Sequence, residues 1–419
     1  MVNAMSDGCP ERVLVIGDDM RIFLAVVRSL GRAGKEVHAA PFNRHSPALR
    51  SKYISAVHHF PCYADDPAAW RASVLSVLRA FSFQLIVPCT DPTILAFDAH
   101  REEFAGYPIA IPKADAMGLL FDKEKTHELC VALGIPVNDS ARISASSTAP
   151  TLISRFGLPL VLKPRRSYWL DRLGTADKVW IVENEAELRR VLTVISEPSR
   201  YLVEGYFEGS GVGVSVLARD GEILHAFQHR RLREGRGGSS SYRVSEPINE
   251  ELLRACRKIC EHTQLTGVCM FEFRYNLDTH RWVLLETNAR FWGSLPLPVS
   301  LGVDFPRFLY DLMVNRTGHA PVPYRTGIRA RNLVLDGFNL FKGMRDLRPG
   351  NIATWLGDLG DFVAQPMRWL SGRERSDTFV KDDIRPGMWE CLTLAGGIGQ
   401  KLMRTRDPEP QRRRGEQAA

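Results

Sequence analysis

The chain has 419 residues, of which 44% are hydrophobic and 25% charged. This is an ordinary globular composition, and the length exceeds one hydrophobic core, so about two or three domains are expected. The 55 basic and 48 acidic residues give a net charge of +7, but the arginines are dispersed and no basic helix interleaved with aromatics occurs. The composition therefore argues against nucleic acid as a partner and suits a site for a small acidic ligand such as a nucleotide.

The cysteines indicate a reducing compartment. Eight are scattered along the chain without a C-x-x-C pair, and no second Cys or His pair joins Cys256 and Cys260 to complete a zinc set. The first ten residues lack a signal-peptide pattern, and no run of about 18 apolar residues predicts a transmembrane helix. We therefore expect a cytoplasmic protein with free thiols and no transmembrane segment.

The N-terminal region alternates strands and helices. Gly17 stands alone after the first strand, so the G-x-G-x-x-G pattern of a dinucleotide site is missing. The order is typical of a parallel sheet with crossover helices. The expected strands are Arg12–Ile16, Glu36–Ala39, Gln84–Pro88 and Ile109–Ile111, and the expected helices are Arg21–Ala33 and Trp70–Phe81.

The middle of the chain mixes short strands with helices. Asp122 is a suitable N-cap for the first of these helices, and Gly134 follows its end. Arg219-Asp220-Gly221 is a strong hairpin turn signal. The expected helices are Asp122–Leu133, Glu185–Val194, Glu250–Thr263 and Phe305–Asn315, and the expected strands are Leu160–Lys163, Val179–Val182, Tyr201–Glu204, Gly213–Ala218 and Glu222–Arg230.

Two carboxylates inside apolar, strand-like runs are the most informative feature. A hairpin centred on Thr279 places Glu272 directly opposite Glu286, roughly 5 Å apart at Cβ. Facing carboxylates repel and are costly in a dry core unless a cation lies between them. Mg²⁺ prefers such oxygen ligands together with substrate phosphates. The alternative is that Arg274 and Arg281 satisfy the two carboxylates separately.

Other charged residues fit nucleotide chemistry. Strand alternation puts Asn288 and Arg290 on the face of Glu286. Lys163 ends an apolar strand, where a cation needs an anion, and Lys123 opens a helix, whose free N–H groups favour phosphate. The alternatives are an acidic partner for Lys163 and plain surface exposure for Lys123.

Four motifs together resemble the ATP-grasp superfamily, in the branch that contains biotin carboxylase, the carbamoyl-phosphate synthetase large chain and carboxylate–amine ligases. They are DKEKTHELCVALGIPV at 122–137, LPLVLKP at 158–164, LVEGYFEGSG at 202–211, and FEF with LLETNARFWGS at 271–294. The resemblance covers about residues 12–320. It implies an α/β and α+β protein with the ATP-grasp fold and an N-terminal doubly wound, Rossmann-like domain.

The expected organisation has five parts. They are a pre-ATP-grasp domain (11–112), a small ATP-grasp lobe (113–200), a C-terminal ATP-grasp lobe with the metal site (201–320), a helical extension (321–402) and a disordered basic tail (403–419). The extension either packs on the body or forms an amphipathic peripheral contact with a membrane or partner. A homodimer is expected only by analogy with relatives.

The resemblance also implies roles for the residues. Mg²⁺ or Mn²⁺ would be ligated by Glu272, Glu286 and Asn288, and Arg290 would steady the carboxylate or acyl phosphate. Arg231 and Arg233 would alternate onto one face toward the substrate, unless they form a solvated strand edge. ATP would be bound by Lys123 and Lys163 at its phosphates, by Glu204 with the backbone around Tyr206 and Phe207 at its adenine, and by Glu208 as the one acid close to its ribose.

The leading functional prediction is an ATP-dependent ligase. It would activate a small carboxylate as an acyl phosphate and join it to an amine, with Lys163 and Arg290 assisting transfer. A lid should exclude water, and loop 164–177 or segment 228–242 could supply it. The alternatives are carboxylation or carbamoyl-phosphate chemistry, and a nucleotide-binding regulatory protein without turnover.

Overall fold

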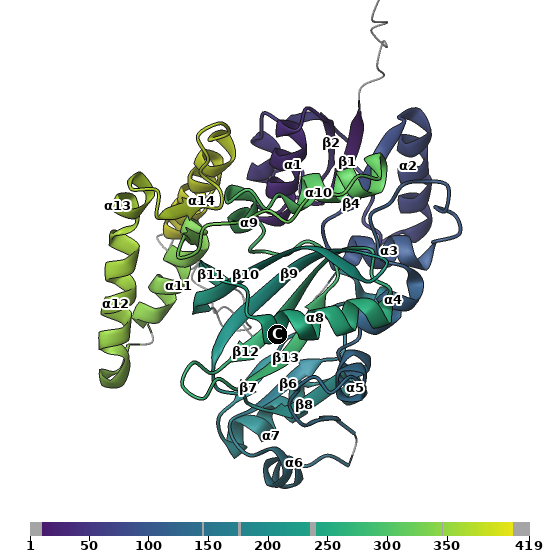
Figure 1. The fold of residues 1–419 in the computed structure, drawn as a ribbon. Coiled ribbons are helices and arrows are strands. Elements are labelled where there is room, and N and C mark those ends of the chain that lie inside the picture. The colour runs from purple at the N-terminus through teal and green to yellow at the C-terminus, as the bar shows by residue number, and fades with distance from the viewer. Residues whose placement is uncertain (1–10, 145, 175–176, 235–239, 346, 405–419) are drawn as a thin grey trace, which may run out of the picture.

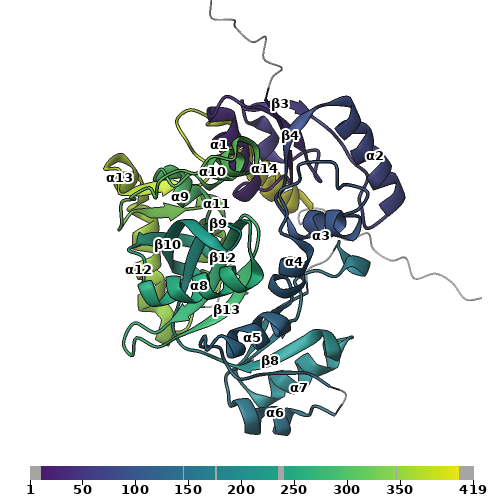
Figure 2. The same ribbon diagram turned by 45° about the vertical axis from the view of Figure 1, so that its right-hand side comes forward.

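Three β-sheets organise the molecule. The computed structural model describes residues 11–404 apart from residues 145, 175–176, 235–239 and 346. Most of the tail expected at 403–419 therefore lies outside the described residues. Figure 1 shows the N-terminal sheet and its helices above the large sheet, and the small sheet with α6 and α7 below it. Figure 2 shows the small sheet set apart from the N-terminal sheet, with α4 and α5 between them.

The N-terminal sheet is parallel, with the order β3-β2-β1-β4. Segment Ile109–Ile111 was expected as a strand but contributes only an isolated bridge from Ile109 to Ile86. β3 has no clear strand pattern in the sequence because it is short and only half buried. The elements are β1 (Arg12–Ile16), α1 (Ile22–Arg32), β2 (Glu36–Ala40), β3 (Ile54–Val57), α2 (Pro67–Ala80), β4 (Phe83–Pro88) and α3 (Asp91–Ala99).

The small sheet is antiparallel, with the order β5-β8-β6-β7. The expected N-cap is confirmed, since the Asp122 carboxylate accepts from the N–H groups of Glu124 and Lys125. The elements are α4 (Ala114–Leu120), α5 (Lys123–Ala132), β5 (Ser140–Arg142), α6 (Ala149–Phe156), β6 (Leu160–Pro164), β7 (Trp180–Val182), α7 (Glu185–Val194) and β8 (Tyr201–Gly205).

The large sheet has seven strands in the order β13-β12-β9-β10-β11-β14-β15. The expected turn at Asp220-Gly221 is confirmed by positive φ at both residues. The strands are β9 (Ser210–Arg219), β10 (Glu222–Glu234), β11 (Ser240–Glu246), β12 (Gly267–Tyr275), β13 (Trp282–Asn288), β14 (Arg329–Arg331) and β15 (Glu374–Ser376), and the neighbouring helices are α8 (Glu250–Thr263), α9 (Pro296–Ser300) and α10 (Phe305–Tyr310).

The N-terminal sheet and the large sheet share one hydrophobic core. Phe23 and Leu24 of α1 lie in the same buried cluster as Phe227 of β10, Trp292 and Phe305. The small sheet has a core of its own, which contains Leu160, Leu162 and Val203. The first two layers are therefore packed as one body, whereas the small lobe is packed separately.

The C-terminal extension is anchored by buried ion pairs. Its elements are α11 (Leu333–Arg345), α12 (Ile352–Val363), α13 (Gln365–Leu370) and α14 (Arg385–Arg404). Arg331 binds Asp336 and Glu374, with N–O distances of 2.5 and 2.9 Å, and Arg243 binds Asp377 at 2.5 Å. Such pairs need their partners because an uncompensated buried charge is costly. The expected packing on the body is therefore present.

Aromatic residues of the extension are not all in a core. Trp369 is 42% exposed and Trp389 is 43% exposed. Trp355 is half-buried and donates its indole N–H to the carbonyl of Leu340. No helix among the described residues is long and apolar enough to span a bilayer.

Glu390 of α14 gives a pH-dependent test of this packing. Burial raises the pKa of Glu390 to about 7, and Asp377 adds to the rise. Since the unfolded carboxyl ionises first, the free energy of unfolding should fall as pH rises from about 4.5 to about 7. We predict that Glu390→Gln stabilises the protein by about 1–2 kcal/mol at pH 8 and much less at pH 5, after allowance for partial exposure. Urea unfolding at both pH values measures this, and an equal gain at both would contradict it.

Candidate active site

The opposed carboxylates lie on β13, an edge strand of the large sheet, and on its neighbour β12. β12 and β13 pair with Glu272 directly opposite Glu286, so the predicted register is confirmed. The amide Nδ2 of Asn288 is 3.3 Å from a Glu272 oxygen and 3.2 Å from a Glu286 oxygen. The two carboxylates therefore converge on one point. A register shift next to this pair leaves Leu285 without a partner across the strand.

Each carboxylate is paired with a cation, but neither cation is Arg274 or Arg281, the alternatives named from the sequence. Arg231 of β10 contacts Glu272 at 2.5 Å, and Lys123 contacts Glu286 at 3.4 Å. Arg274 instead binds Glu234 at 2.7 Å. The pair is thus embedded in a charged network that spans two sheets.

The two carboxylates have opposite pKa shifts. Burial alone would raise the pKa of Glu286, but Lys123, Asn288 and Lys163 outweigh it and lower the value to about 2. Burial raises the pKa of Glu272, and the nearby Glu286 charge adds to the rise, although Arg231 opposes it. Glu286 is therefore the carboxylate that is firmly ionised at neutral pH.

An apolar slot of about 120 Å³ lies between the small and large sheets. Lys163 lies beside it, with its ammonium 2.7 Å from Glu204 and 3.2 Å from the carbonyl oxygen of Leu285. The acidic partner considered for Lys163 is thus present. Residues that line the slot include Val179, Ile181, Glu204, Tyr206, Phe207 and Glu286. Glu208, the residue considered for ribose, is exposed and is not part of this lining.

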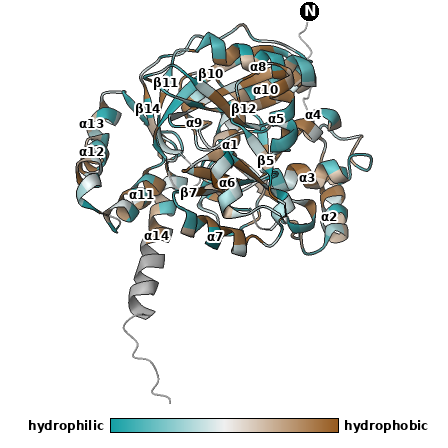
Figure 3. Ribbon diagram, turned by 90° about the horizontal axis from the view of Figure 1, so that it is seen from below, coloured by the Kyte–Doolittle hydropathy of each residue, from teal (hydrophilic) through white to brown (hydrophobic). Residues whose placement is uncertain are grey.

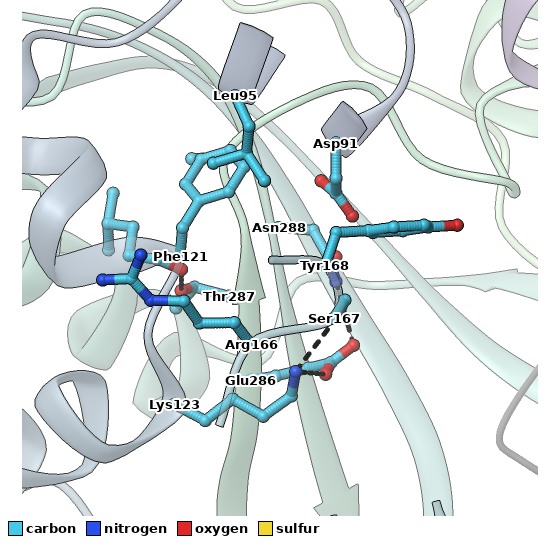
Figure 4. A pocket seen from close by; sticks show the side chains of 12 residues that line it. Asp91, Leu95, Phe121, Lys123, Arg166, Ser167, Tyr168, Glu286, Thr287 and Asn288 are labelled. Carbon is cyan, nitrogen blue, oxygen red and sulfur yellow. Dashed lines mark hydrogen bonds and ion pairs between the residues drawn. The ribbon is translucent and has the colours of Figure 1, made fainter. Parts of the chain in front are cut away.

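The described part of loop 164–177 lies beside Glu286. Ser167 and Tyr168 line a small pocket with Glu286, and the Ser167 hydroxyl is 3.1 Å from the Lys123 ammonium. Figure 4 shows Lys123 lying between Ser167 and Glu286. Arg166 is fixed to Asp122 at 3.2 Å. The sequence offered no signal for Ser167 or Tyr168, and residues 175–176 of this loop lie outside the described part of the chain.

Arg290 is held by the N-terminal domain. Its guanidinium binds both oxygens of Asp91, at 2.5 and 3.0 Å, and donates to the carbonyl of Phe291. Burial opposes the charge on Arg290, but Asp91 more than compensates and raises its pKa. Asp91 is the first residue of α3, and no local pattern in the sequence indicates its link to a residue 199 positions away.

Arg290 also lines a cavity of about 290 Å³. Arg21, at the N-cap of α1, reaches this cavity and lies against Gly293. His229 of β10 and Trp292 are buried in its wall, and neither His229 Nδ1 nor Trp292 Nε1 has a hydrogen-bond partner among the described residues. Burial lowers the pKa of His229, and Arg231 and Arg243 lower it further. The cavity therefore offers a cation and a neutral imidazole.

The expectation that Arg231 and Arg233 share one face is wrong. The register between β10 and β11 shifts between these residues, which turns Arg233 to the opposite side. Arg231 lines the cavity, whereas Arg233 is bound to Asp336 at 2.5 Å and Asp358 at 2.8 Å. Arg233 therefore anchors the C-terminal extension.

The donor set fits Mg²⁺ only with help from a ligand. In the described ranges no group of three or more His, Cys, Asp and Glu side chains could hold a metal ion. Glu272 and Glu286 nevertheless bring two carboxylates together with the Asn288 amide, which also carries an oxygen. Mg²⁺ is commonly bound by one or two carboxylates with water and substrate phosphates. The residues fit such an ion.

Comparisons with known proteins agree with this architecture. A family model described as "ATP-grasp in the biosynthetic pathway with Ter operon" matches residues 197–334. The carbamoyl phosphate synthase large chain of Vibrio cholerae is 25% identical over 232 residues, which cover 52% of this chain and 21% of that protein. The D-alanine–D-alanine ligase of Corynebacterium aurimucosum is 24% identical over 237 residues, covering 50% and 64%. The chain spans about a fifth of the length of the synthase.

Solved structures share the fold. The biotin carboxylase domain of the Hydrogenobacter thermophilus 2-oxoglutarate carboxylase, solved with MgADP, ADP and bicarbonate, superimposes with a TM-score of 0.60 at 15% identity. The match covers 76% of this chain and 73% of that chain. The chain therefore has the ATP-grasp fold, its residues 197–334 match an ATP-grasp family model, and it is similar to biotin carboxylase and the carbamoyl phosphate synthase large chain.

Proposed function

We propose that the protein is an ATP- and Mg²⁺-dependent ligase that joins a small carboxylate to an amine. The observation that carries the proposal is the convergence of Glu272, Glu286 and Asn288 between a lysine-bearing slot and a second, cationic cavity. An oxygen-ligand site between two such spaces suits phosphoryl transfer from a nucleotide to a second substrate. The similarity to a D-alanine–D-alanine ligase supports this type of reaction.

In this proposal the slot between the sheets takes ATP. Its apolar walls accept the adenine, and Glu204 with the backbone around Tyr206 and Phe207 borders the ring. The Lys163 ammonium, now paired with Glu204, lines the slot and would meet the phosphates there. Lys123 reaches the terminal phosphate beside Glu286. We assign no ribose contact to Glu208.

The reaction divides into two displacements. Mg²⁺ bound by Glu272, Glu286 and Asn288 would neutralise charge on the triphosphate. A substrate carboxylate oxygen attacks the γ-phosphorus, the bond to the β-phosphate oxygen breaks, and ADP and an acyl phosphate form. The amine nitrogen then attacks the acyl carbon, phosphate leaves and the amine loses its proton. Lys123, Lys163 and Arg290 stabilise the developing negative charge.

Arg290 and the lid serve the acyl phosphate. Because Asp91 holds both edges of the guanidinium, Arg290 is fixed before substrate arrives, which lowers the cost of orienting it. Ser167 and Tyr168 lie over Glu286 and would exclude water that hydrolyses the intermediate.

We infer that the ligase works in a reducing cytoplasm, because all seven described cysteines are free.

The second cavity would hold the carboxylate substrate. Arg21 supplies a cation, and the neutral His229 and the Trp292 indole can offer N–H donors that lack partners among the described residues. Donors and a cation select an anionic, oxygen-rich ligand. Arg231, which is paired with Glu272, lines the same cavity. A cavity of about 290 Å³ suits a molecule of amino-acid or small-dipeptide size.

Replacement of Glu286 tests the ligase directly. Glu286→Gln keeps the shape but removes the ionised carboxylate, so ADP release with pooled carboxylates and amines should fall by roughly a thousandfold. Mass spectrometry of the wild-type mixture should show an amide product. Glu261→Gln, on the exposed side of α8, is the matched control. Normal turnover in Glu286→Gln would remove this residue from the metal site, and ATP binding without stimulated turnover in the wild type would favour a regulatory protein.

Replacement of Arg21 tests the assignment of the second cavity. Arg21→Gln removes a charged donor, so the KM for the carboxylate substrate should rise about 10–100-fold while the KM for ATP stays the same. Arg79→Gln, which alters an exposed arginine of α2, is the control and should change neither constant. A parallel rise in both KM values would assign Arg21 to the nucleotide or to the fold.

A further inference from the structure

Helices α12 and α13 carry an apolar stripe that faces solvent. The stripe is formed by Ile352, Leu356, Val363, Met367 and Leu370, which are 43%, 54%, 68%, 76% and 80% exposed. On α12, Ile352, Leu356 and Val363 follow spacings of three and four residues together with Gly360 and so share one helical face, and Met367 and Leu370 continue the spacing on α13. Neither helix has a buried residue. Exposed large side chains normally occur singly, whereas a continuous stripe marks an interaction surface.

Helix α11 adds aromatic and basic side chains next to this stripe. Phe338 is 53% exposed and Phe341 is 47% exposed. Lys342 lies 5.5 Å from the ring centre of Phe338, and Arg345 lies 4.7 Å from that of Phe341. Figures 1 and 3 show α11, α12 and α13 together at the edge of the molecule. Interleaved aromatic and basic residues are typical of helices that lie at a lipid headgroup layer.

Acidic and basic side chains of the extension differ in their partners. Described acids next to the stripe are paired: Asp336 with Arg233 and Arg331, and Asp358 with Arg233. Asp361 is likewise paired with Arg329 and Arg368. The exposed cations of residues 333–373 are Lys342, Arg345, Arg348 and Arg373, and none of the four has an ion pair with another described residue. The outer side of the extension is therefore apolar and positively charged.

We propose that this outer side of α11–α13 is a peripheral membrane-binding surface for bilayers that contain anionic lipids. The stripe spans residues 352–370, about 28 Å of helix, and would lie in the plane of the interface. Charge decides between occupants. A second copy of the chain would bring the same four cations into contact, whereas anionic headgroups neutralise them.

Vesicle sedimentation tests the proposal with the full-length protein. The wild type should sediment with phosphatidylcholine vesicles that contain phosphatidylglycerol, and much less with phosphatidylcholine alone. Val363→Glu/Met367→Glu and Lys342→Glu/Arg345→Glu should each weaken binding by at least about tenfold. Added salt should weaken the wild type in the same direction. Circular dichroism melting of each variant checks that the fold is kept.

Matched substitutions separate this surface from exposed apolar residues in general. Val131→Glu/Val194→Glu alters two residues of α5 and α7 that are 60% and 59% exposed, and should leave vesicle binding unchanged. Failure of the wild type to sediment with anionic vesicles would overturn the proposal. A dimer in light scattering that Val363→Glu/Met367→Glu dissolves, without lipid binding, would assign the surface to a second copy and overturn it equally.

Discussion

The structure depends on keeping two like charges within reach of each other. Glu272 and Glu286 face each other across an antiparallel pair, where like charges are unfavourable. The surrounding elements supply the compensation: β10 brings Arg231, the start of α5 brings Lys123, and Asn288 bridges both carboxylates. Because these contributors come from three separate parts of the chain, the site exists only in the folded protein. A divalent ion and a triphosphate would replace part of this internal compensation.

The same constraint explains why the N-terminal domain is part of the site. Arg290 follows the carboxylate strand and would be a third cation near the pair without a partner of its own. Asp91 balances it from α3, and Arg21 reaches the neighbouring cavity from α1. The shared core of α1 with Trp292 and Phe305 keeps these residues in register with the large sheet. The N-terminal domain thus supplies charged side chains to the site and also holds them in place.

Local patterns in the sequence predicted much of the fold and the centre of the site. Helices Glu185–Val194 and Glu250–Thr263 and strand Arg12–Ile16 have the predicted bounds, because periodicity and caps are encoded locally. The pairing of Glu272 with Glu286 followed from the symmetric spacing around the turn. The family resemblance supplied the residues that we propose for nucleotide binding. All of these signals lie within short stretches of chain.

The failures have a common physical origin in long-range or irregular structure. One irregularity in β10 sends Arg233 to Asp336, since alternation holds only while the register is unbroken. Asp91 and Arg21 join the site across the domain contact, which no local pattern reports. Strand β15 has three residues and is defined only by its neighbour β14. Burial and pairing partners, rather than propensity, decide these positions.

The separate core of the small lobe means that the two lysines belong to different mechanical units. Lys163 and Glu204 lie on β6 and β8, whose apolar side chains pack within that lobe. Lys123 opens α5, whose Leu129 and Cys130 pack with the large sheet. A rotation of the lobe would therefore carry Lys163 across the mouth of the slot while Lys123 stayed beside Glu286. If both lysines bind phosphates as we propose, one would stay fixed and the other would move, so their hold on the triphosphate would change with the angle of the small lobe.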